Sequence, residues 1–389
     1  MEAIQIKKCV VIPTYWGPAD GSEEIVFDHP TPLNSKGTLA RLLNNLLEFE
    51  EIKRGEIPVR IVGIANRKDL RDKVEDLLES YLEGYSNKME LKLCSYSWLN
   101  NLKNKLDEKG IHSFFPIEPD SYSQIRNLCL LAALETKSDI GIFLDDDELL
   151  TDKNYFDKSE EGMYSIAEDN GTILGKAGYY KEDKQDFSKF WELKWWPKTA
   201  VFNETFERLI REKPRFKATM VALGGNMVIS KDVMKSVCFD PYVNRGEDMD
   251  YVFNARMFGY RFYFDPELFI EHYPPEKKTP DWKKAREDIY RFLYLREKYR
   301  GHLQSEKVQK IAFEEFLPYP GVFMQDDLED RIIEHSRMMA MRYLSENDKE
   351  AFSACMENAK IPFLYKKNAD IISDFLKTTN SWREITQNI

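Results

Sequence analysis

The stretch DIGIFLDDDE, residues 139–148, joins an apolar run to a row of carboxylates. Residues 139–144 have the pattern of a central β-strand, and Asp145, Asp146 and Asp147 follow where that strand would end. Ligands of open α/β sheets usually lie beside the carboxyl ends of the strands. The stretch therefore predicts an α/β fold with an acidic site at one edge of the sheet.

On both sides of this stretch, short apolar runs alternate with helical patterns, which is typical of a layered α/β protein. The sequence predicts strands at residues 9–13, 59–65, 90–95 and 223–229, helices at 38–47, 67–81, 121–135 and 247–258, and a pair of strands at 261–264 and 268–272. From residue 281 onward the sequence is charged, helical in pattern and poor in glycine, and the strongest break is PYPG at 318–321.

Composition excludes several classes of protein. A net charge of -11 argues against general attraction to nucleic acid, because that affinity comes mainly from basic residues. The five cysteines are scattered and form no CxxC pair, so we expect buried free thiols in a reducing compartment. The first residues lack the features of a signal peptide, and no window approaches the ~20 apolar residues of a membrane span. We expect a cytoplasmic protein without a transmembrane segment.

Three consecutive carboxylates repel one another unless a cation lies among them. Mg²⁺ and Mn²⁺ prefer carboxylate oxygens, and Mg²⁺ typically binds one or two protein carboxylates while substrate phosphates and water complete its shell. That chemistry describes a nucleotide-diphosphate site. The competing interpretation is a solvated acidic turn, and the position of Asp145, Asp146 and Asp147 after an apolar strand favours the metal.

Two further motifs carry groups of the same kind. Arg245, Gly246, Glu247 and Asp248 form a loop that opens into a predicted helix, where carboxylates also serve as ordinary caps or dipole partners. His272 lies in a strand-like segment, and imidazole is a competent ligand for Mn²⁺-class metals, although a lone histidine is more often structural.

Four motifs in order resemble the glycosyltransferases of the GT-A fold, especially the large family two. They are Ile125-Arg126-Asn127 before FLDDDE, GGN at 224–226, RGEDMD at 245–250 and EHY at 271–273, and the resemblance covers about residues 8–274. It implies a Rossmann-like, mostly parallel sheet flanked by helices. We expect a catalytic domain at 1–280, with a nucleotide-sugar half at 1–150 and an acceptor half at 151–280, and a helical region at 281–389.

The resemblance also implies roles for the acidic residues. Asp145 and Asp147 match the DxD signature, with Asp147 on a Mn²⁺ or Mg²⁺ ion that bridges the donor diphosphate, Asp145 on the metal or nucleotide, and Asp146 on the donor side. His272 matches a histidine that completes the metal shell. Asp248, with Glu247 beside it, matches the general base of inverting members.

Other positions match the donor side of the family. Arg126 matches an arginine near the nucleotide, Pro13 and Thr14 match the end of the first strand, and Gly225 and Arg245 lie in matching motifs. The family usually has an acidic residue after the second strand, where this chain has Asn66, whose amide can pair with a base edge. A UDP-sugar is the expected donor, with a GDP-sugar possible.

Several alternatives stay open at this stage. A retaining GT-A enzyme acting on glycerate or phosphoglycerate needs the same metal and donor, whereas a sugar-phosphate nucleotidyltransferase would need a basic Gly-rich signature that VVIPTYWGPADG lacks. A scaffold protein would be expected to lose the carboxylates. The aromatic residues Phe190, Trp191, Trp195 and Trp196 line an acceptor site or form core. The C-terminal helices could form a homo-oligomer.

Overall fold

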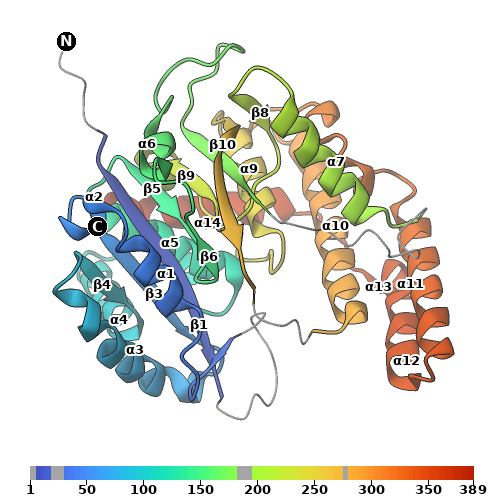
Figure 1. Ribbon diagram of the computed structural model, residues 1–389. Coiled ribbons are helices and arrows are strands. Elements are labelled where there is room, and N and C mark those ends of the chain that lie inside the picture. Colours follow the sequence, from blue (N-terminus) through green and yellow to red (C-terminus); the bar gives the residue numbers. More distant parts are fainter. Residues whose placement is uncertain (1–5, 19–29, 182–194, 275–278) are drawn as a thin grey trace.

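The computed structural model describes residues 6–18, 30–181, 195–274 and 279–389, which form a twisted sheet with helices on both faces (Figure 1). Its strands are β1 (Lys8–Gly17), β2 (Thr31–Pro32), β3 (Val59–Ala65), β4 (Leu91–Cys94), β5 (Ile140–Phe143), β6 (Glu148–Leu149), β7 (Gly175–Tyr180), β8 (Lys217–Thr219), β9 (Met227–Ser230) and β10 (Phe262–His272). Its helices are α1 (Leu39–Leu46), α2 (Glu50–Lys53), α3 (Arg71–Ser86), α4 (Tyr96–Glu108), α5 (Tyr122–Glu135), α6 (Tyr155–Glu160), α7 (Lys198–Arg211), α8 (Lys231–Ser236), α9 (Glu247–Met257), α10 (Asp281–Gln304), α11 (Leu328–Ser345), α12 (Lys349–Asn358), α13 (Ile361–Leu364) and α14 (Ile371–Gln387).

The order of the strands explains where a ligand can bind. The sheet runs β4-β3-β1-β5-β9-β7-β10-β6, with β2 beside β1 and β8 beside β10. The chain moves outward from β1 through β3 to β4 and then returns to the other side of β1, where β5 pairs with it in parallel. Clefts of open α/β sheets form at such a reversal, outside the carboxyl ends of the strands. The acidic run follows β5 directly at this point.

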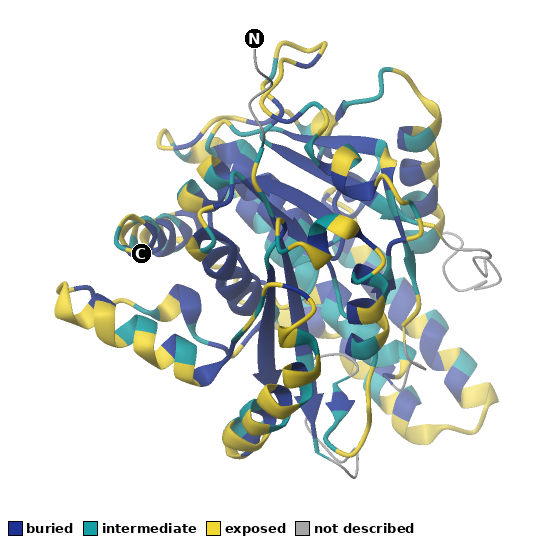
Figure 2. Ribbon diagram, turned by 60° about the vertical axis from the view of Figure 1, so that its left-hand side comes forward, coloured by how far each residue is buried: buried dark blue, intermediate teal, exposed yellow. Residues whose placement is uncertain are grey.

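Apolar side chains cover both faces of the sheet, and Figure 2 shows the strands buried at the centre. Successive residues of β1 point to opposite faces, so that Cys9 and Val11 join one core while Val10 and Ile12 join the other. The first core includes α5, α9 and α10, and the second includes α1 and α3. All five cysteines are buried and free, as the sequence predicts. None of the described helices is long and apolar enough to cross a membrane.

The predicted strand at residues 59–65 is confirmed as β3, and the helices predicted at 121–135 and 247–258 are confirmed as α5 and α9 within one residue at each end. Other boundaries are corrected, and the helix predicted at 67–81 is α3, at Arg71–Ser86. β1 continues past residue 13 to Gly17, because β2 and β3 pair with that extension. β9 begins at Met227 and not at residue 223, because the Asn226 N–H donates to the Leu223 carbonyl in a turn.

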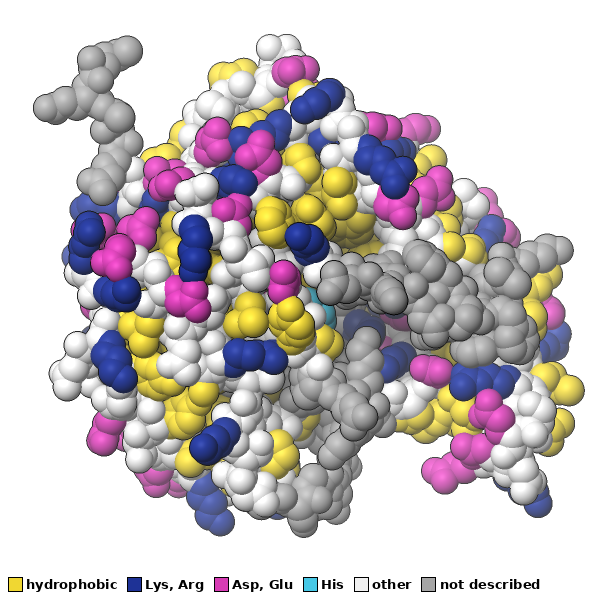
Figure 3. Space-filling view, viewed as in Figure 1, with side chains coloured by type: hydrophobic (Ala, Val, Ile, Leu, Met, Phe, Trp, Pro, Cys, Tyr) yellow, Lys and Arg dark blue, Asp and Glu magenta, His cyan; other side chains and the backbone are white. Residues whose placement is uncertain are grey.

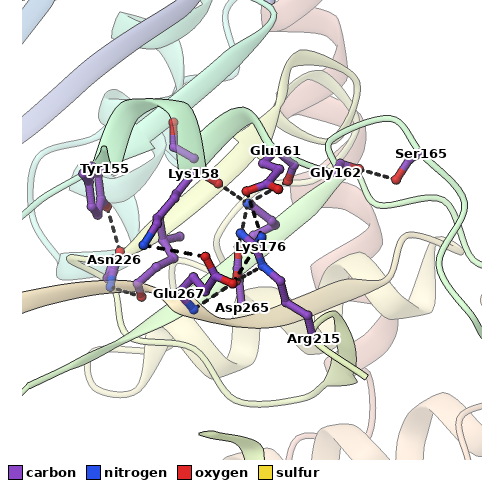
Figure 4. Close-up of polar contacts among 12 residues, drawn as sticks. Tyr155, Lys158, Glu161, Gly162, Ser165, Lys176, Arg215, Asn226, Asp265 and Glu267 are labelled. Atoms are coloured by element: carbon purple, nitrogen blue, oxygen red, sulfur yellow. Dashed lines mark hydrogen bonds and ion pairs between the residues drawn. The ribbon is translucent and has the colours of Figure 1, made fainter. Parts of the chain in front are cut away.

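A further correction concerns β10, a single strand where a pair was predicted. Its pairing with β7 shifts register between Phe264 and Phe269, so one irregular strand takes the place of two. Figure 4 shows the polar cluster at this irregularity. The buried Lys176 ammonium lies 2.8 Å from Asp265, and the Arg215 guanidinium donates to both carboxylate oxygens of Asp265 at 2.9 and 3.1 Å. The cluster fixes the course of β10 toward His272.

The C-terminal helices share the core of the sheet domain. The Trp382 indole of α14 donates to the Met234 carbonyl of α8 at 3.0 Å. From α10, the Lys298 ammonium lies 2.7 Å from Asp240 and 2.8 Å from Asp250 of α9, and all three residues are buried. Two carboxylates and one ammonium therefore connect α10 to the helix that begins with Glu247. On the face drawn in Figure 3, basic and acidic side chains are interspersed and form no single basic area.

We expect Lys298→Met to lower the free energy of unfolding by about 3–5 kcal/mol, because it leaves two buried carboxylates without their cation. Urea unfolding followed by circular dichroism measures this. Lys377→Met is the control, since Lys377 pairs with Asp374 at the surface with 73% of its side chain exposed, and its midpoint should match that of the wild type. Equal stability of Lys298→Met and wild type would contradict a role for the buried cluster.

Candidate active site at the carboxyl ends of β1 and β5

Asp145, the first carboxylate after β5, is held by an arginine. The Arg126 guanidinium of α5 contacts both of its oxygens, at 2.8 Å from Nη1 and 3.1 Å from Nη2. Arg126 was predicted near the nucleotide and Asp145 on the metal or nucleotide, and the structure joins them in a bidentate ion pair. Arg126 is buried because α5 packs its whole length against the sheet.

Asp146 connects the ends of three elements. Its carboxylate accepts hydrogen bonds from the hydroxyls of Thr14, in β1, at 2.6 Å and of Thr38, before α1, at 3.1 Å. Thr14 also accepts from the Trp16 indole at 3.0 Å. Burial, followed by the charge of Asp147, raises the pKa of Asp146 to about 7 against the opposing hydroxyl bonds. Thr14 of β1 and Asp146 after β5 therefore contact each other at the point where the strand order reverses.

Asp147 lies beside His272, the other residue that the resemblance assigned to the metal. The imidazole Nε2 at the end of β10 is 3.4 Å from the Asp147 carboxylate, and both side chains are partly exposed. The ring of Tyr180, at the end of β7, stacks on His272 with centroids 4.6 Å apart. Behind the pair, the Arg41 guanidinium donates to the carbonyls of Asp147 and Tyr273. Backbone and ring contacts therefore hold two potential metal ligands in place.

The donor set of Asp147 and His272 fits a hard or borderline divalent cation. Within the described residues, no group of three or more histidine, cysteine, aspartate or glutamate side chains converges on a common metal position. A carboxylate and an imidazole suffice where substrate phosphates complete the shell, and this combination suits Mn²⁺ or Mg²⁺. The two ligands therefore match a cation that binds together with a diphosphate.

Glu148 directly follows the acidic run and is buried under it. It is fully buried, and its carboxylate accepts the Asp145 N–H at 2.8 Å. Burial and then the charges of Asp145 and Asp147 raise the pKa of Glu148 well above its ordinary value. A Cβ on Gly225 would lie 1.9 Å from a Glu148 oxygen, so a glycine is required there. The structure thus places Gly225, predicted near the donor, against Glu148.

Glu247 and Asp248 begin α9 on the other side of Arg126. A carboxylate oxygen of Glu247 lies 3.6 Å from the Arg126 Nε. The two carboxylate oxygens of Asp248 accept backbone N–H groups, one from Gly224 at 3.2 Å and the other from Met249 at 2.7 Å. Arg126 therefore contacts the acidic run and the second acid pair at once, as expected for a single site.

The turn before this acid pair requires glycine for two reasons. Gly246 has φ of 71°, in the left-handed region that favours glycine. A Cβ there would also lie 2.2 Å from the Arg291 guanidinium of α10. Burial raises the pKa of Asp248, while Arg291 and Arg126 oppose the rise. Arg291 was not predicted, because α10 carries no motif and its charged residues fit any solvated helix.

A cavity of about 520 Å³ lies next to the Gly246 turn that precedes the acid pair, because Arg245 and Arg291 are both in its wall. Its wall combines tyrosines with charged and small polar groups: Asp120, Ser121, Tyr122, Tyr242, Val243, Asn244, Arg245, Glu287, Tyr290, Arg291, Tyr294 and Tyr365. Arg245, predicted on the donor side, lies 3.0 Å from Glu287 and 3.4 Å from Asp288. Its guanidinium therefore belongs to this wall, where it faces α10.

The remaining predicted residues lie in β1, after β3, in or near the core, and outside the described residues. Pro13 lies in β1, and Asn66 is buried after β3 with its N–H bonded to the Trp16 carbonyl at 2.7 Å. Trp196 is core, because it is 2% exposed and stacks on His335 with centroids 5.1 Å apart. Trp195 is half-buried. Phe190 and Trp191 lie outside the described residues.

No protein-family model matches the sequence, and no curated protein matches it. Solved structures do match its fold. A mannosyltransferase from Pyrobaculum calidifontis, in complex with GDP-Man and Mn²⁺, is 12% identical with a TM-score of 0.50 over 99% of this chain and 86% of that one. A glucosyl-3-phosphoglycerate synthase from Mycobacterium tuberculosis, with Mn²⁺, uridine-diphosphate and phosphoglyceric acid, is 13% identical with a TM-score of 0.39 over 75% and 78% of the two chains. The match to the P. calidifontis structure confirms the predicted GT-A architecture.

Gly225→Ala should lower the free energy of unfolding by about 1–3 kcal/mol, because the new methyl group overlaps the Glu148 carboxylate in a packed interior. Chemical denaturation measures the loss. Gly84→Ala in α3 is the matched control, since nothing lies within 4 Å of its added Cβ, and it should be neutral or stabilising by up to ~1 kcal/mol. If the two variants behaved alike, the contact between Gly225 and Glu148 would not matter for stability.

Proposed function

We propose that the protein is a glycosyltransferase that moves a sugar from a nucleotide-diphosphate sugar to an acceptor hydroxyl. The proposal rests on one observation: Asp147 and His272 lie 3.4 Å apart at the edge of a GT-A sheet, while Arg126 connects the adjacent acidic run to Glu247, the neighbour of Asp248. A diphosphate site thus lies next to a group able to accept a proton.

Asp147 and His272 would hold a Mn²⁺ or Mg²⁺ ion together with the donor diphosphate. When bound, such an ion stabilises the negative charge that develops on the departing nucleoside diphosphate. Asp146 keeps the loop in place through Thr14 and Thr38. Asn66, at the end of β3, would meet the nucleobase. We favour a UDP-sugar, and the GDP-Man bound by the P. calidifontis enzyme makes a GDP-sugar the second donor to test.

Asp248 would act as the general base. Two backbone N–H groups fix its carboxylate, and the charges of Arg291 and Arg126 favour the ionised form in a partly buried position. As Asp248 removes the proton of the acceptor hydroxyl, the oxygen attacks the anomeric carbon from the face opposite the leaving group, so a single displacement inverts the configuration. General-base catalysis of this kind contributes about 10²–10⁴-fold in rate.

The cavity beside Asp248 would bind the acceptor. Its arginines are already paired, Arg245 with Glu287 and Asp288, and Arg291 with Asp288 at 3.6 Å. A balanced wall rich in tyrosine suits an uncharged polyhydroxylated ligand, because tyrosine rings pack on sugar faces and paired charges offer both donors and acceptors. A sugar acceptor is therefore favoured over phosphoglycerate, which would need uncompensated cations.

Two substitutions separate the proposed roles. Asp147→Ala should abolish the Mn²⁺-dependent stabilisation by a UDP-sugar or GDP-sugar, because it removes a metal ligand. Asp248→Asn should retain that stabilisation and lower transfer by about 10²-fold or more, because the amide cannot accept the proton. Thermal shift with and without Mn²⁺ measures the first effect, and product formation measures the second.

The wild type is the reference for both assays, and Asp374→Asn, at a surface pair with Lys377, is the control for loss of a distant carboxylate. Equal loss of donor binding by Asp147→Ala and Asp248→Asn would contradict the separate roles. If no nucleotide sugar stabilised the wild type in a metal-dependent manner, the proposed activity itself would be rejected.

The pH dependence of transfer tests the acid pair. Burial and then the charge of Asp248 raise the pKa of Glu247 to about 7, and burial raises the pKa of Asp248. Because the base must be ionised, kcat/KM should rise with pH through a limb well above the ordinary carboxyl value of ~4. Glu247→Gln should move this limb to lower pH, since it removes the neighbouring negative charge.

Folding stability gives the matching thermodynamic readout. The pKa of Glu247 is higher in the native state than in the unfolded chain, so the native state binds its proton more tightly. The free energy of unfolding should therefore fall as pH rises from ~4.3 toward 7. Glu247→Gln should weaken that fall.

In the rate measurements, saturating Mn²⁺ keeps metal binding constant across the pH range. A limb of kcat/KM that stays at the same pH in Glu247→Gln would show that the two acids are not coupled.

A further inference from the structure

Phe363 and Leu364 of α13 are more exposed than any other large hydrophobic side chain in the described part of the chain, at 78% and 69%. Single exposed apolar residues are ordinary, but two adjacent ones on a short helix form a continuous apolar surface. Ile361, two residues earlier, is buried in the core and anchors the turn. The protein therefore presents an apolar tip on a fixed base.

Lysines flank this pair on both sides. Lys360 precedes it, and the exposed Lys366 and Lys367 follow it. Residues 359–369 contain no aspartate or glutamate, although the whole chain has a net charge of -11. Lys360 pairs with Glu357 at 2.7 Å, with more than half of both side chains exposed. We call Lys360, Phe363, Leu364, Lys366 and Lys367 the basic-apolar tip.

We propose that the basic-apolar tip docks on the surface of a lipid bilayer that contains anionic lipids. Phe363 and Leu364 enter the boundary between head groups and acyl chains, and the lysines contact lipid phosphates. Each lysine near an anionic membrane surface adds attraction that salt screens. Lysines stand before and after the apolar pair in the sequence. This order suits a bilayer surface, where charged head groups lie outside the apolar acyl chains.

A second copy of the chain fits this tip less well. Phe363 and Leu364 can bury roughly 300 Å² of side-chain surface, well below the ~1,200 Å² of a stable protein interface. A two-fold contact through the tip would also bring the lysines of one copy against those of the other. A bilayer needs neither a large flat area nor a complementary shape, so the small exposed tip favours lipid.

The tip adjoins the cavity beside Asp248. Tyr365, the residue after Leu364, lines that cavity, and its ring lies 6.4 Å from that of Tyr290 on the same wall. Docking brings the cavity to the membrane surface. If the proposed glycosyl transfer is correct, on which this step rests, the acceptor is a saccharide carried by a lipid and not one that diffuses freely in water.

Cosedimentation of the full chain with vesicles tests the docking. The wild type should bind phosphatidylcholine vesicles that contain about one quarter phosphatidylglycerol, and bind pure phosphatidylcholine more weakly. Replacement of both Phe363 and Leu364 by serine should lower the partition coefficient by about tenfold or more. Replacement of both Lys366 and Lys367 by glutamine should remove the preference for anionic vesicles. Ile166→Ser, at a 64% exposed position with no flanking lysine, should change nothing.

A label reports insertion directly. Since the five native cysteines are buried, Phe363→Cys can be labelled selectively with an environment-sensitive fluorophore, whose emission should rise on anionic vesicles, whereas the same label at Ile166→Cys should not respond. Retention of wild-type vesicle binding by the double serine variant would overturn the proposal, as would failure of the wild type to bind. Light scattering that shows a dimer dissociated by the serine variant would assign the tip to a second copy.

The same variants separate this proposal from the proposed activity. Donor stabilisation with Mn²⁺, measured without vesicles, should be unchanged in the double serine variant, because the tip contains no donor ligand. Vesicle binding without donor binding would retain the docking and reject the glycosyltransferase. Donor binding without vesicle binding would reject the docking alone.

Discussion

The buried guanidinium of Arg126 is the contact on which the geometry of the site depends. It reaches Asp145 at the end of β5 and Glu247 at the start of α9, two carboxylates that would repel each other without it. It can do so because Gly224 has no side chain, since a Cβ there would lie 2.5 Å from the guanidinium. One cation thus sets the distance between the acidic run and the second acid pair.

The irregular backbone of β10 positions side chains near the Arg126 guanidinium. β10 needs a shift of register to bring His272 opposite Glu148 and beside Asp147, and the ion cluster of Lys176, Asp265 and Arg215 holds that shift. Bulges of this kind re-aim a strand next to functional sites. The position of the imidazole therefore depends on charges in the interior of the sheet as much as on its own strand.

Much of this could be predicted from the sequence, and the exceptions have physical reasons. The apolar run before Asp145 and the Gly246 turn are local signals, so the acidic edge and the start of α9 were predictable. The single strand β10 was not predictable, because Asp265 and Pro266 are typical of a turn. They lie within an extended strand because Lys176 and Arg215, which are far away in the sequence, pair with Asp265. Arg291 was not predictable either, since a helix with charged residues looks the same whether those charges face water or a site.

α10 shows how closely the C-terminal helices are involved in the site. Glu287, Tyr290, Tyr294 and Lys298 recur every three or four residues on one face of the helix, and Arg291 lies next to Tyr290 on that face. All of these except Lys298 line the cavity, and Lys298 joins the buried cluster with Asp240 and Asp250. The helix that shapes the proposed acceptor wall is therefore fixed by an ion cluster on the helix that carries the proposed base. Any movement of α10 would change the cavity wall and the environment of Asp248 together, so the proposed acceptor binding and the proposed proton transfer would be connected through one helix face.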